Sequence, residues 1–200
     1  MRRHAAGAAG LVLLALILAA CSSTVLRDSW KDPQFQGEPL RNVLVIGVAR
    51  SQSNRRVFED GFVQALRAQG VEGTASYPLL PEDGAIPNER IKQAVARAAA
   101  DAVLITRVLR VDRTVTVTPG YVAPGYPHGF YGWYSETWVA VPPMVDQYDV
   151  LTIESTLWDM RHERAVWSGT SESTEPKDVT TLTGELAKLL IARMKADKVL

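Results

Sequence analysis

The sequence predicts an α/β domain in which helices pack on a mixed sheet. Three observations support this fold: continuous aliphatic runs typical of buried strands, apolar helical stripes between them, and an alternating pattern later in the chain. The predicted order is strand, helix, strand, helix, strand, then an antiparallel β-hairpin and a C-terminal helix (βαβαβ, hairpin, helix). Right-handed crossovers would place the helices on the sheet. With 46% apolar residues, the 200-residue chain can bury a core.

The first half of the chain alternates strands and helices. A first strand without polar interruption is followed by a helix that Gly70 ends, because glycine tolerates the left-handed conformation after a helix. The elements expected here are, in order, strand Asn42–Ala49, a helix capped by Ser53 or Asn54 and running to Gln69, strand Val71–Leu80, and helix Asn88–Ala100.

The second half is richer in strands. A long strand over Asp101–Val117 begins as a buried aliphatic run and becomes alternating from Val111, so we expect it to leave a covered core with one face in water. The later elements are expected to be strand Thr137–Val141, a hairpin of Tyr148–Trp158 and Ala165–Ser173, and a helix over Val179–Lys195.

The N-terminus has the form of a secretory signal. Two arginines precede a short run of Ala, Gly, Leu, Val and Ile that ends at Ala20, and the run is too short to span a bilayer. The only cysteine, Cys21, follows Leu18-Ala19-Ala20, and this tetrapeptide resembles the bacterial lipobox. The resemblance implies a diacylglycerol on the Cys21 sulfur, cleavage before it and acylation of the new amine, with palmitate as the test label. The alternative is an ordinary secretory signal with an incidental cysteine.

These features divide the chain into three parts. Residues 1–20 are the expected signal peptide, residues 21–41 a lipidated tether rich in polar residues, and residues 42–200 a single α/β domain. Ser22, rather than Asp, follows the cysteine, and by resemblance to the sorting rule of enteric bacteria this favours the outer membrane. The domain would therefore face the periplasm, and Trp30 and Phe35 of the tether could dock back on it.

Several classes of chemistry lack their sequence signals. The net charge of zero argues against nucleic-acid binding, and the turn after the first strand has no glycines for a nucleotide phosphate. His4, His128 and His162 are not at metal-ligand spacing, so no metal or other cofactor is expected. Asp159, His162 and Glu163 are predicted to form a solvated hairpin tip. We therefore expect a protein that is not an enzyme, with an envelope glycan hydrolase as a remote alternative.

Charged residues cluster at the start of the first helix. This set comprises Arg55, Arg56, Glu59 and Asp60. Its spacing is typical of a solvated face laced with weak ion pairs, and the other interpretation is a docking site for a partner.

The combined pattern resembles a known group of proteins. It consists of the lipobox, the Val-Leu-Val-Ile-Gly-Val strand, Ala-Asp-Ala-Val-Leu-Ile-Thr, and a late hairpin with Asp159 and Trp167. In these features the chain is similar to uncharacterised periplasmic lipoproteins of Gram-negative bacteria. Their fold is similar to the TolB amino-terminal domain, to the curli-secretion lipoprotein CsgG and to LpoB, the activator of a penicillin-binding protein. The resemblance implies an envelope lipoprotein that works by binding.

Pore-forming members of this group need long amphipathic hairpins. Here the loop is flanked by Thr114–Val117 and Thr137–Val141, whereas a membrane strand takes about 9–11 residues. We therefore expect no pore from this chain, although oligomers and an accessory role in a secretion or pore complex stay open as an alternative function.

A Gly- and Pro-rich loop at 119–135 breaks the regular pattern. It and its flank concentrate the aromatic residues Tyr121, Tyr126, Phe130, Tyr131, Trp133, Tyr134 and Trp138. Because Tyr and Trp are enriched in binding hot spots, these are candidate contacts to an envelope protein, glycan or lipid headgroup. Two other interpretations are a cover over the open sheet and a disordered linker. The expected role is thus a membrane-anchored, non-enzymatic adaptor in envelope assembly or maintenance.

Overall fold

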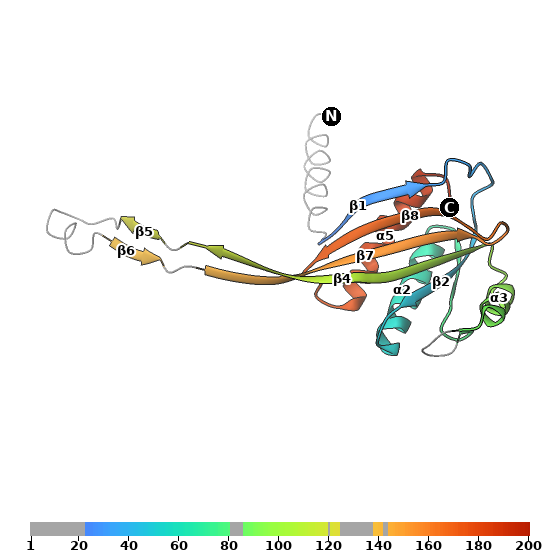
Figure 1. Ribbon diagram of the computed structural model, residues 1–200, viewed down its shortest axis with the longest axis horizontal. Helices are drawn as coiled ribbons and strands as arrows, with labels where there is room; N and C mark the ends of the chain where they lie inside the picture. The colour runs from blue at the N-terminus through green and yellow to red at the C-terminus, as the bar shows by residue number, and fades with distance from the viewer. Residues whose placement is uncertain (1–22, 81–85, 120, 125–137, 142–143) are drawn as a thin grey trace, which may run out of the picture.

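The computed structural model describes residues 23–80, 86–119, 121–124, 138–141 and 144–200, without the side chains of 121–124 and 138–141. It confirms the α/β class and the mixed sheet. A six-stranded sheet with the order β1-β8-β7-β4-β2-β3 forms the body, and a separate two-stranded sheet pairs β5 with β6 (Figure 1). The two sheets lie along one long axis, because β4 and β7 extend far beyond the body before β5 and β6 begin.

The elements follow the expected order except for two unexpected strands, β1 within the expected tether and β5 within the expected loop at 119–135. The strands are β1 Thr24–Lys31, β2 Asn42–Val48, β3 Glu72–Ala75, β4 Ala102–Thr118, β5 Tyr121–Pro124, β6 Trp138–Val141, β7 Met144–Asp159 and β8 Arg164–Thr174. The helices are α2 Gln52–Ala68, α3 Asn88–Arg97 and α5 Val179–Ala196. β2 pairs in parallel with β3 and β4, while the pairs β4–β7, β7–β8 and β8–β1 are antiparallel.

Several predicted boundaries and caps are wrong, including the start of β7, which lies at Met144 rather than Tyr148. The N-cap of α2 is Ser51, not Ser53 or Asn54, because the Ser51 hydroxyl accepts a hydrogen bond from the Asn54 backbone N–H. Helix α3 begins at Asn88 as predicted, but Asn88 does not cap it, no described side chain does, and it ends at Arg97 rather than Ala100. The strand expected over 71–80 is reduced to β3, because the backbone turns at Ser76 to bind a buried carboxylate.

The largest difference concerns the expected tether over 21–41. Residues 24–31 form β1, which pairs antiparallel with β8 at the edge of the sheet, from Thr24↔Ser173 to Lys31↔Trp167. Beyond β1, Phe35 is buried in the core while Trp30 stays about half exposed. The tether prediction fails because an exposed edge strand needs few apolar residues, so its composition is close to that of a linker.

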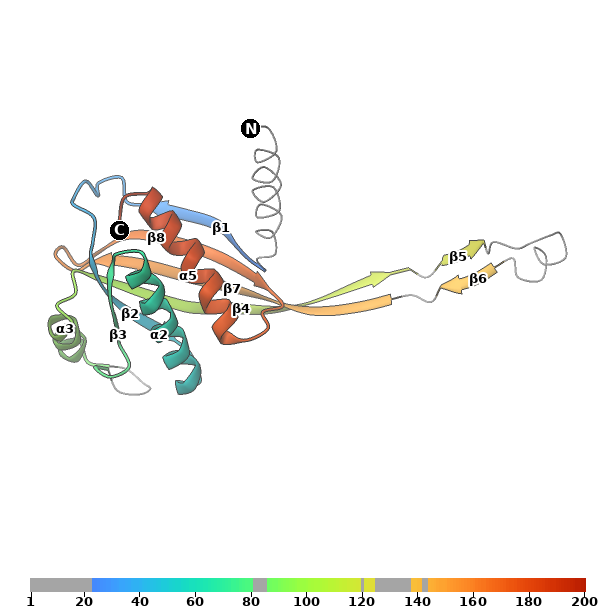
Figure 2. The ribbon, with the colours of Figure 1, turned by 180° about the vertical axis from the view of Figure 1, so that it is seen from behind.

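Helices α2 and α5 lie side by side on one face of the sheet (Figure 2). Their apolar stripes bury the core together with the inward residues of β2, β4 and β7. The largest fully buried apolar side chains are Trp167, Phe62, Leu40, Leu44, Leu66, Leu104, Leu157, Leu186, Leu190 and Met194. Each contributes on the order of 1.5–3 kcal/mol through burial.

The Trp167 of the expected hairpin motif has a packing role. Its ring is fully buried and folds over Gly169, where any Cβ would overlap the indole. The indole N–H donates to the carboxylate of Asp197 at the end of α5, at 2.9 Å. The Trp-Ser-Gly sequence thus ties β8 to the C-terminal helix.

A buried carboxylate joins α2 to two strands. Glu59 has no exposed surface, and its oxygens accept five hydrogen bonds. The donors are the backbone N–H of Gly47 (3.0 Å), Ser76 (2.6 Å) and Tyr77 (2.8 Å), the Ser76 hydroxyl (2.8 Å) and Arg55 Nε (2.9 Å). Every lone pair of the carboxylate therefore has a partner within the chain.

The expected solvated face at the start of the first helix is thus wrong for two of its four members. Arg55 and Glu59 are buried, while Arg56 and Asp60 are exposed as expected. Arg55 Nη2 also donates to the Ser76 hydroxyl at 2.8 Å, which closes the network. The sequence pattern could not distinguish the buried from the exposed members, because all four residues are charged and lie within about one and a half helical turns.

Replacing Glu59 tests how much this network stabilises the body. Glu59→Gln leaves the buried Arg55 without a counter-charge and turns an N–H₂ group toward backbone donors. We expect a loss of about 3–5 kcal/mol in the free energy of unfolding, measured by urea titration. The neighbouring exposed change Asp60→Asn is the control and should shift stability by no more than about 0.5 kcal/mol. Equal effects of the two changes would contradict this account.

Candidate functional site

A long antiparallel arm projects from the body. We define the β-arm as residues 111–118 of β4 paired with residues 144–151 of β7, from Val111↔Leu151 to Thr118↔Met144. Strand β2 pairs with β4 only up to Arg107, and β8 pairs with β7 only from Val150 onward. Over most of its described length the β-arm is therefore a two-stranded ribbon, and β5 and β6 continue it outward (Figure 1).

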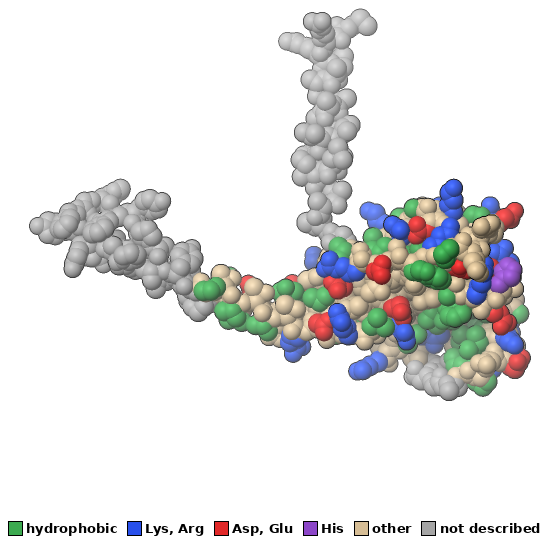
Figure 3. Space-filling model, turned by 45° about the horizontal axis from the view of Figure 1, so that its top comes forward, with side chains coloured by type: hydrophobic (Ala, Val, Ile, Leu, Met, Phe, Trp, Pro, Cys, Tyr) green, Lys and Arg blue, Asp and Glu red, His purple; other side chains and the backbone are tan. Residues whose placement is uncertain are grey.

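The β-arm has two different faces, because side chains alternate along each strand and directly paired residues share a face. The valine face carries Val111, Val115 and Val117 of β4 with Val145 and Leu151 of β7, and the Arg113, Asp149 and Gln147 side chains lie among them. Its four valines are 54–63% exposed (Figure 3). The threonine face carries Asp112, Thr114, Thr116 and Thr118 of β4 with Met144, Asp146, Tyr148 and Val150 of β7.

The valine face continues the helix-covered face of the body. Leu151 packs against the core, and Val111 is its direct partner across the ladder. At this level an apolar groove of about 190 Å³ opens between the sheet and the first turns of α2 and α5. Its apolar lining includes Phe58, Val108, Leu151, Ile153, Leu182 and Leu186. The apolar surface of the core is thus continuous with the valine face, which is uncovered because the helices end where the β-arm begins.

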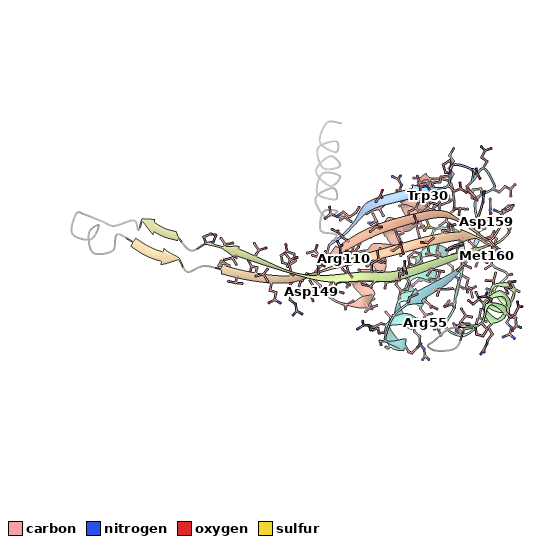
Figure 4. The ribbon with its side chains drawn as sticks, viewed as in Figure 1. Trp30, Arg55, Arg110, Asp149, Asp159 and Met160 are labelled. Atoms are coloured by element: carbon pink, nitrogen blue, oxygen red, sulfur yellow. The ribbon has the colours of Figure 1, made fainter. Side chains whose placement is uncertain are left out.

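Charged pairs accompany this strip near the base of the β-arm. Arg113 Nε lies 3.3 Å from Asp149 Oδ1 within the valine face, and Arg110 Nε lies 2.6 Å from Asp112 Oδ2 (Figure 4). All four side chains are more than 40% exposed, so each pair contributes about 0–1 kcal/mol. Their main effect is to neutralise charge along the β-arm.

The premise that only the short segments Thr114–Val117 and Thr137–Val141 flank the loop is therefore wrong, while the expectation that this chain forms no pore stays a prediction. The segment Thr114–Val117 is part of a 17-residue strand, and β7 extends over 16 residues to match it. The alternation within β4 predicts one solvent-exposed face. The length of the ribbon also depends on its partner strand, which lies about 30 positions further along the chain and was not visible from β4 alone.

Two of the aromatic candidates begin the strands of the small outer sheet. Tyr121 begins β5 and Trp138 begins β6, where Tyr121 pairs with Val141 and Pro124 with Trp138. The remaining candidates, Tyr126, Phe130, Tyr131, Trp133 and Tyr134, lie outside the described residues, as do the side chains of Tyr121 and Trp138. The described backbone of β5 and β6 lies away from the body in both views (Figures 1 and 2).

The predicted lipid-attachment residue, Cys21, also lies outside the described residues. The chain is held to the body almost immediately afterwards. The hydroxyls of Ser23 and Thr24 donate to Glu185 Oε2 of α5 at 3.0 and 2.8 Å. Only two residues therefore separate Cys21 from Thr24, the first residue of β1.

The turn between β7 and β8 holds the second cluster considered from the sequence. It lies at the end of the sheet opposite the β-arm (Figure 4). Asp159 is buried and accepts from the Arg161 backbone and guanidinium at 2.9 and 3.0 Å, while His162 Nδ1 lies 2.8 Å from its other oxygen. Burial opposes ionisation most strongly, but hydrogen bonds from Arg161 and His162 together outweigh it and lower the pKa of Asp159. The fully solvated tip predicted here is wrong for Asp159, which stabilises the turn.

Metal clusters and membrane-spanning helices are both absent from the part of the chain that the structure describes. Within those ranges, no three His, Cys, Asp or Glu side chains gather as metal ligands would. Of the described helices, none is both long and apolar enough to cross a membrane.

Comparison with known proteins gives distant likenesses. No known family profile matches the chain, and no curated protein sequence matches it. The PelC dodecamer from Paraburkholderia phytofirmans is similar at 17% identity and a TM-score of 0.43, over 84% of this chain and 94% of that one. Lipoprotein GNA1162 from Neisseria meningitidis is similar at 15% identity and a TM-score of 0.37, over 78% and 99%. With scores below 0.5, the expected relationship to TolB, CsgG and LpoB stays a prediction.

Truncating the β-arm tests whether it is independent of the body. Replacing residues 113–149 by a two-residue Asn-Gly turn removes the exposed ribbon and the whole aromatic segment. Since the described residues within this range contribute nothing to the buried core, we expect the thermal midpoint to change by no more than about 2 °C. A large fall would instead support the interpretation in which the aromatic rings cover the sheet. Calorimetry on both proteins makes the comparison.

Proposed function

We propose that this protein is a lipid-anchored, periplasm-facing lipoprotein of the bacterial outer membrane that works by binding, as an adaptor in envelope assembly or maintenance. The observation that carries this proposal is the β-arm. It is an uncovered ribbon with an apolar face, and it ends in the most aromatic segment of the chain. Soluble domains rarely leave such a strip exposed unless it contacts something else.

The lipid anchor is supported by the sequence around Cys21. A charged start, a short apolar run, small residues and the only cysteine all agree with a lipobox. Two or more acyl chains on one residue would hold the protein stably on a membrane. Because β1 begins at Thr24, the body would stand directly at the bilayer surface rather than at the end of a long tether.

A binding role is also supported by the state of the buried carboxylates. Glu59 and Asp159, the two least exposed acidic side chains among the described residues, are fully engaged by donors of the same chain. An acid or base that acts on a substrate needs an oxygen directed into an accessible site. These two groups stabilise the fold instead.

The reach of the β-arm suits contact with a partner away from the body. Residues 111–118 of β4 span roughly 25 Å, and β5 lies beyond them (Figure 1). Tyr121 and Trp138 begin β5 and β6 beyond its far end. Together with the residues between them in sequence, they are the candidate contacts to an envelope protein or glycan: Tyr121, Tyr126, Phe130, Tyr131, Trp133, Tyr134 and Trp138. Aromatic side chains are suited to this, because they bury a large area with few rotatable bonds.

A second candidate function is an accessory subunit of a secretion or pore complex, formed by several copies. The length of β4 and β7 favours it, because both strands exceed the roughly 9–11 residues that a membrane strand requires. The Arg113–Asp149 pair within the valine face opposes it, since charge on a lipid-facing surface at the bilayer centre costs about 2–4 kcal/mol per basic residue. We therefore favour the adaptor.

The anchor is tested by Cys21→Ser expressed with the native signal. We expect the protein to leave the outer-membrane fraction and to lose labelling by radioactive palmitate, because the thiol that accepts the lipid is gone. Ser22→Ala is the matched control and should keep both. Persistent labelling of the serine variant would show that the lipid is elsewhere.

The binding role is tested by changing aromatic residues of the segment that connects β5 to β6 in sequence, while leaving the paired strands of the β-arm, its stem, intact. In Tyr131→Ala/Trp133→Ala/Tyr134→Ala, we expect an unchanged thermal midpoint and loss of the proteins that crosslink to the wild type in intact cells, identified by mass spectrometry. Tyr148→Ala, on the stem, should keep them. Identical crosslinks in all three proteins would contradict a contact through the aromatic segment.

A further inference from the structure

The start of the described chain and the base of the β-arm lie on one row across the sheet. Thr24 pairs with Ser173, Ser173 pairs with Leu151, and Leu151 pairs with Val111. At about 4.8 Å between neighbouring strands, this row is roughly 14 Å long. Figure 1 shows the same arrangement, with the first residues of β1 beside the base of the β-arm.

The position of Cys21 follows from this row. Three residue steps separate Cys21 from Thr24, so the two lie at most about 11 Å apart. The hydrogen bonds from Ser23 and Thr24 to Glu185 hold this end of the chain on α5. The lipid would therefore enter the bilayer within roughly 25 Å of Val111.

This places the anchor at the junction of the body and the β-arm. From the row of Val111, β4 runs in one direction into the body and in the other along the β-arm. A bilayer that touches the junction cannot let the β-arm rise steeply, because the body would then be driven into the lipid. Because α2 and α5 lie on the same side of the sheet as the valine face, contact through that face requires the molecule to tilt, so that the β-arm dips into the surface and the helix layer stays above it (Figure 2).

The geometry points to the valine face of the β-arm as a membrane-contact surface, which rests among the headgroups and upper acyl chains of the leaflet that holds Cys21. This inference depends on the lipid anchor of the proposed function. The face is apolar enough for interfacial binding, with four valines that are each more than half exposed. The Arg113–Asp149 pair carries no net charge, and the long Arg113 side chain can reach the headgroup level.

A membrane suits this surface better than a second copy of the chain. The anchor keeps the valine face close to lipid, so the effective concentration of lipid at this face is high. Even a weak intrinsic affinity is then enough for contact. Packing against another copy would depend on protein density in the membrane. Contact with lipid and contact with a second copy can therefore be distinguished by whether they depend on protein density.

Single-cysteine labelling separates these outcomes. Lipidated protein is reconstituted into phosphatidylethanolamine–phosphatidylglycerol vesicles, and an environment-sensitive dye is attached at Val115→Cys or Val117→Cys. Thr114→Cys and Thr116→Cys, on the same strand but the opposite face, are the matched controls. We expect a blue shift on the valine face, with loss of emission when nitroxide-labelled lipids are added, and little change on the threonine face.

Two results would overturn the inference. One is equal behaviour of both faces; the other is a shift on the valine face that follows protein density and is insensitive to nitroxide lipids, which would indicate a second copy. Circular dichroism of each labelled protein checks that the exposed substitutions leave the fold intact.

Failure of the anchor itself is detected separately. Acylated Cys21 has no free thiol, so the parent protein should not take up the dye. Stoichiometric labelling of the parent would refute the lipid anchor, whereas an unlabelled parent combined with identical faces refutes only the membrane contact.

Discussion

The carboxylate of Glu59 is the interaction on which the arrangement of the body depends. It binds the last part of β2 through Gly47 and the turn after β3 through Ser76 and Tyr77, so one helical side chain fixes α2 over two strands. A charge with no exposed surface is tolerated only because all its acceptor sites are filled. The absence of a side chain at Gly47 is part of the same constraint, since a Cβ there would lie 2.7 Å from the Phe58 ring.

With α2 fixed in this way and α5 packed beside it, the helix layer has a definite end, and the sheet extends past it. The row that contains Leu151 and Val111 marks that end. On one side the apolar face is covered by helices, and on the other it is the exposed valine face of the β-arm. The alternating apolar side chains of β4 and β7 thus form part of the core within the body and the exposed valine face beyond it.

The parts of this fold that local sequence could predict are those whose burial depends on their own pattern. The run around Val43 and Val45 is aliphatic because β2 is covered on both faces, and the apolar stripe from Leu182 to Met194 indicates α5 directly. Strand β1 was missed because half of it faces solvent and its partner lies far along the chain. The burial of Glu59 was missed for a similar reason, since a charged residue on a helix indicates an exposed position unless the donors around it are known.

The extent of the β-arm depends on the register between β4 and β7, which the sequence of neither strand alone determines. Among the candidate site residues, Tyr121 was expected within the loop over 119–135 but begins strand β5, whereas Trp138 lies in an expected strand and begins β6.

The pairing of β1 with β8 also has a consequence for the order of events in biogenesis. The Thr24 and Ser173 hydroxyls that meet across this pair are 149 positions apart, and closing a loop of that length costs about 4 kcal/mol of chain entropy. If the chain is secreted as the proposed function requires, the β1 segment emerges from the inner membrane long before β8. The enzymes expected to acylate and cleave at Cys21 would therefore meet a free, extended segment, and the last edge of the sheet would close only after the protein is already attached to lipid. Folding would then finish at the bilayer surface, with the anchored end as the final strand to join.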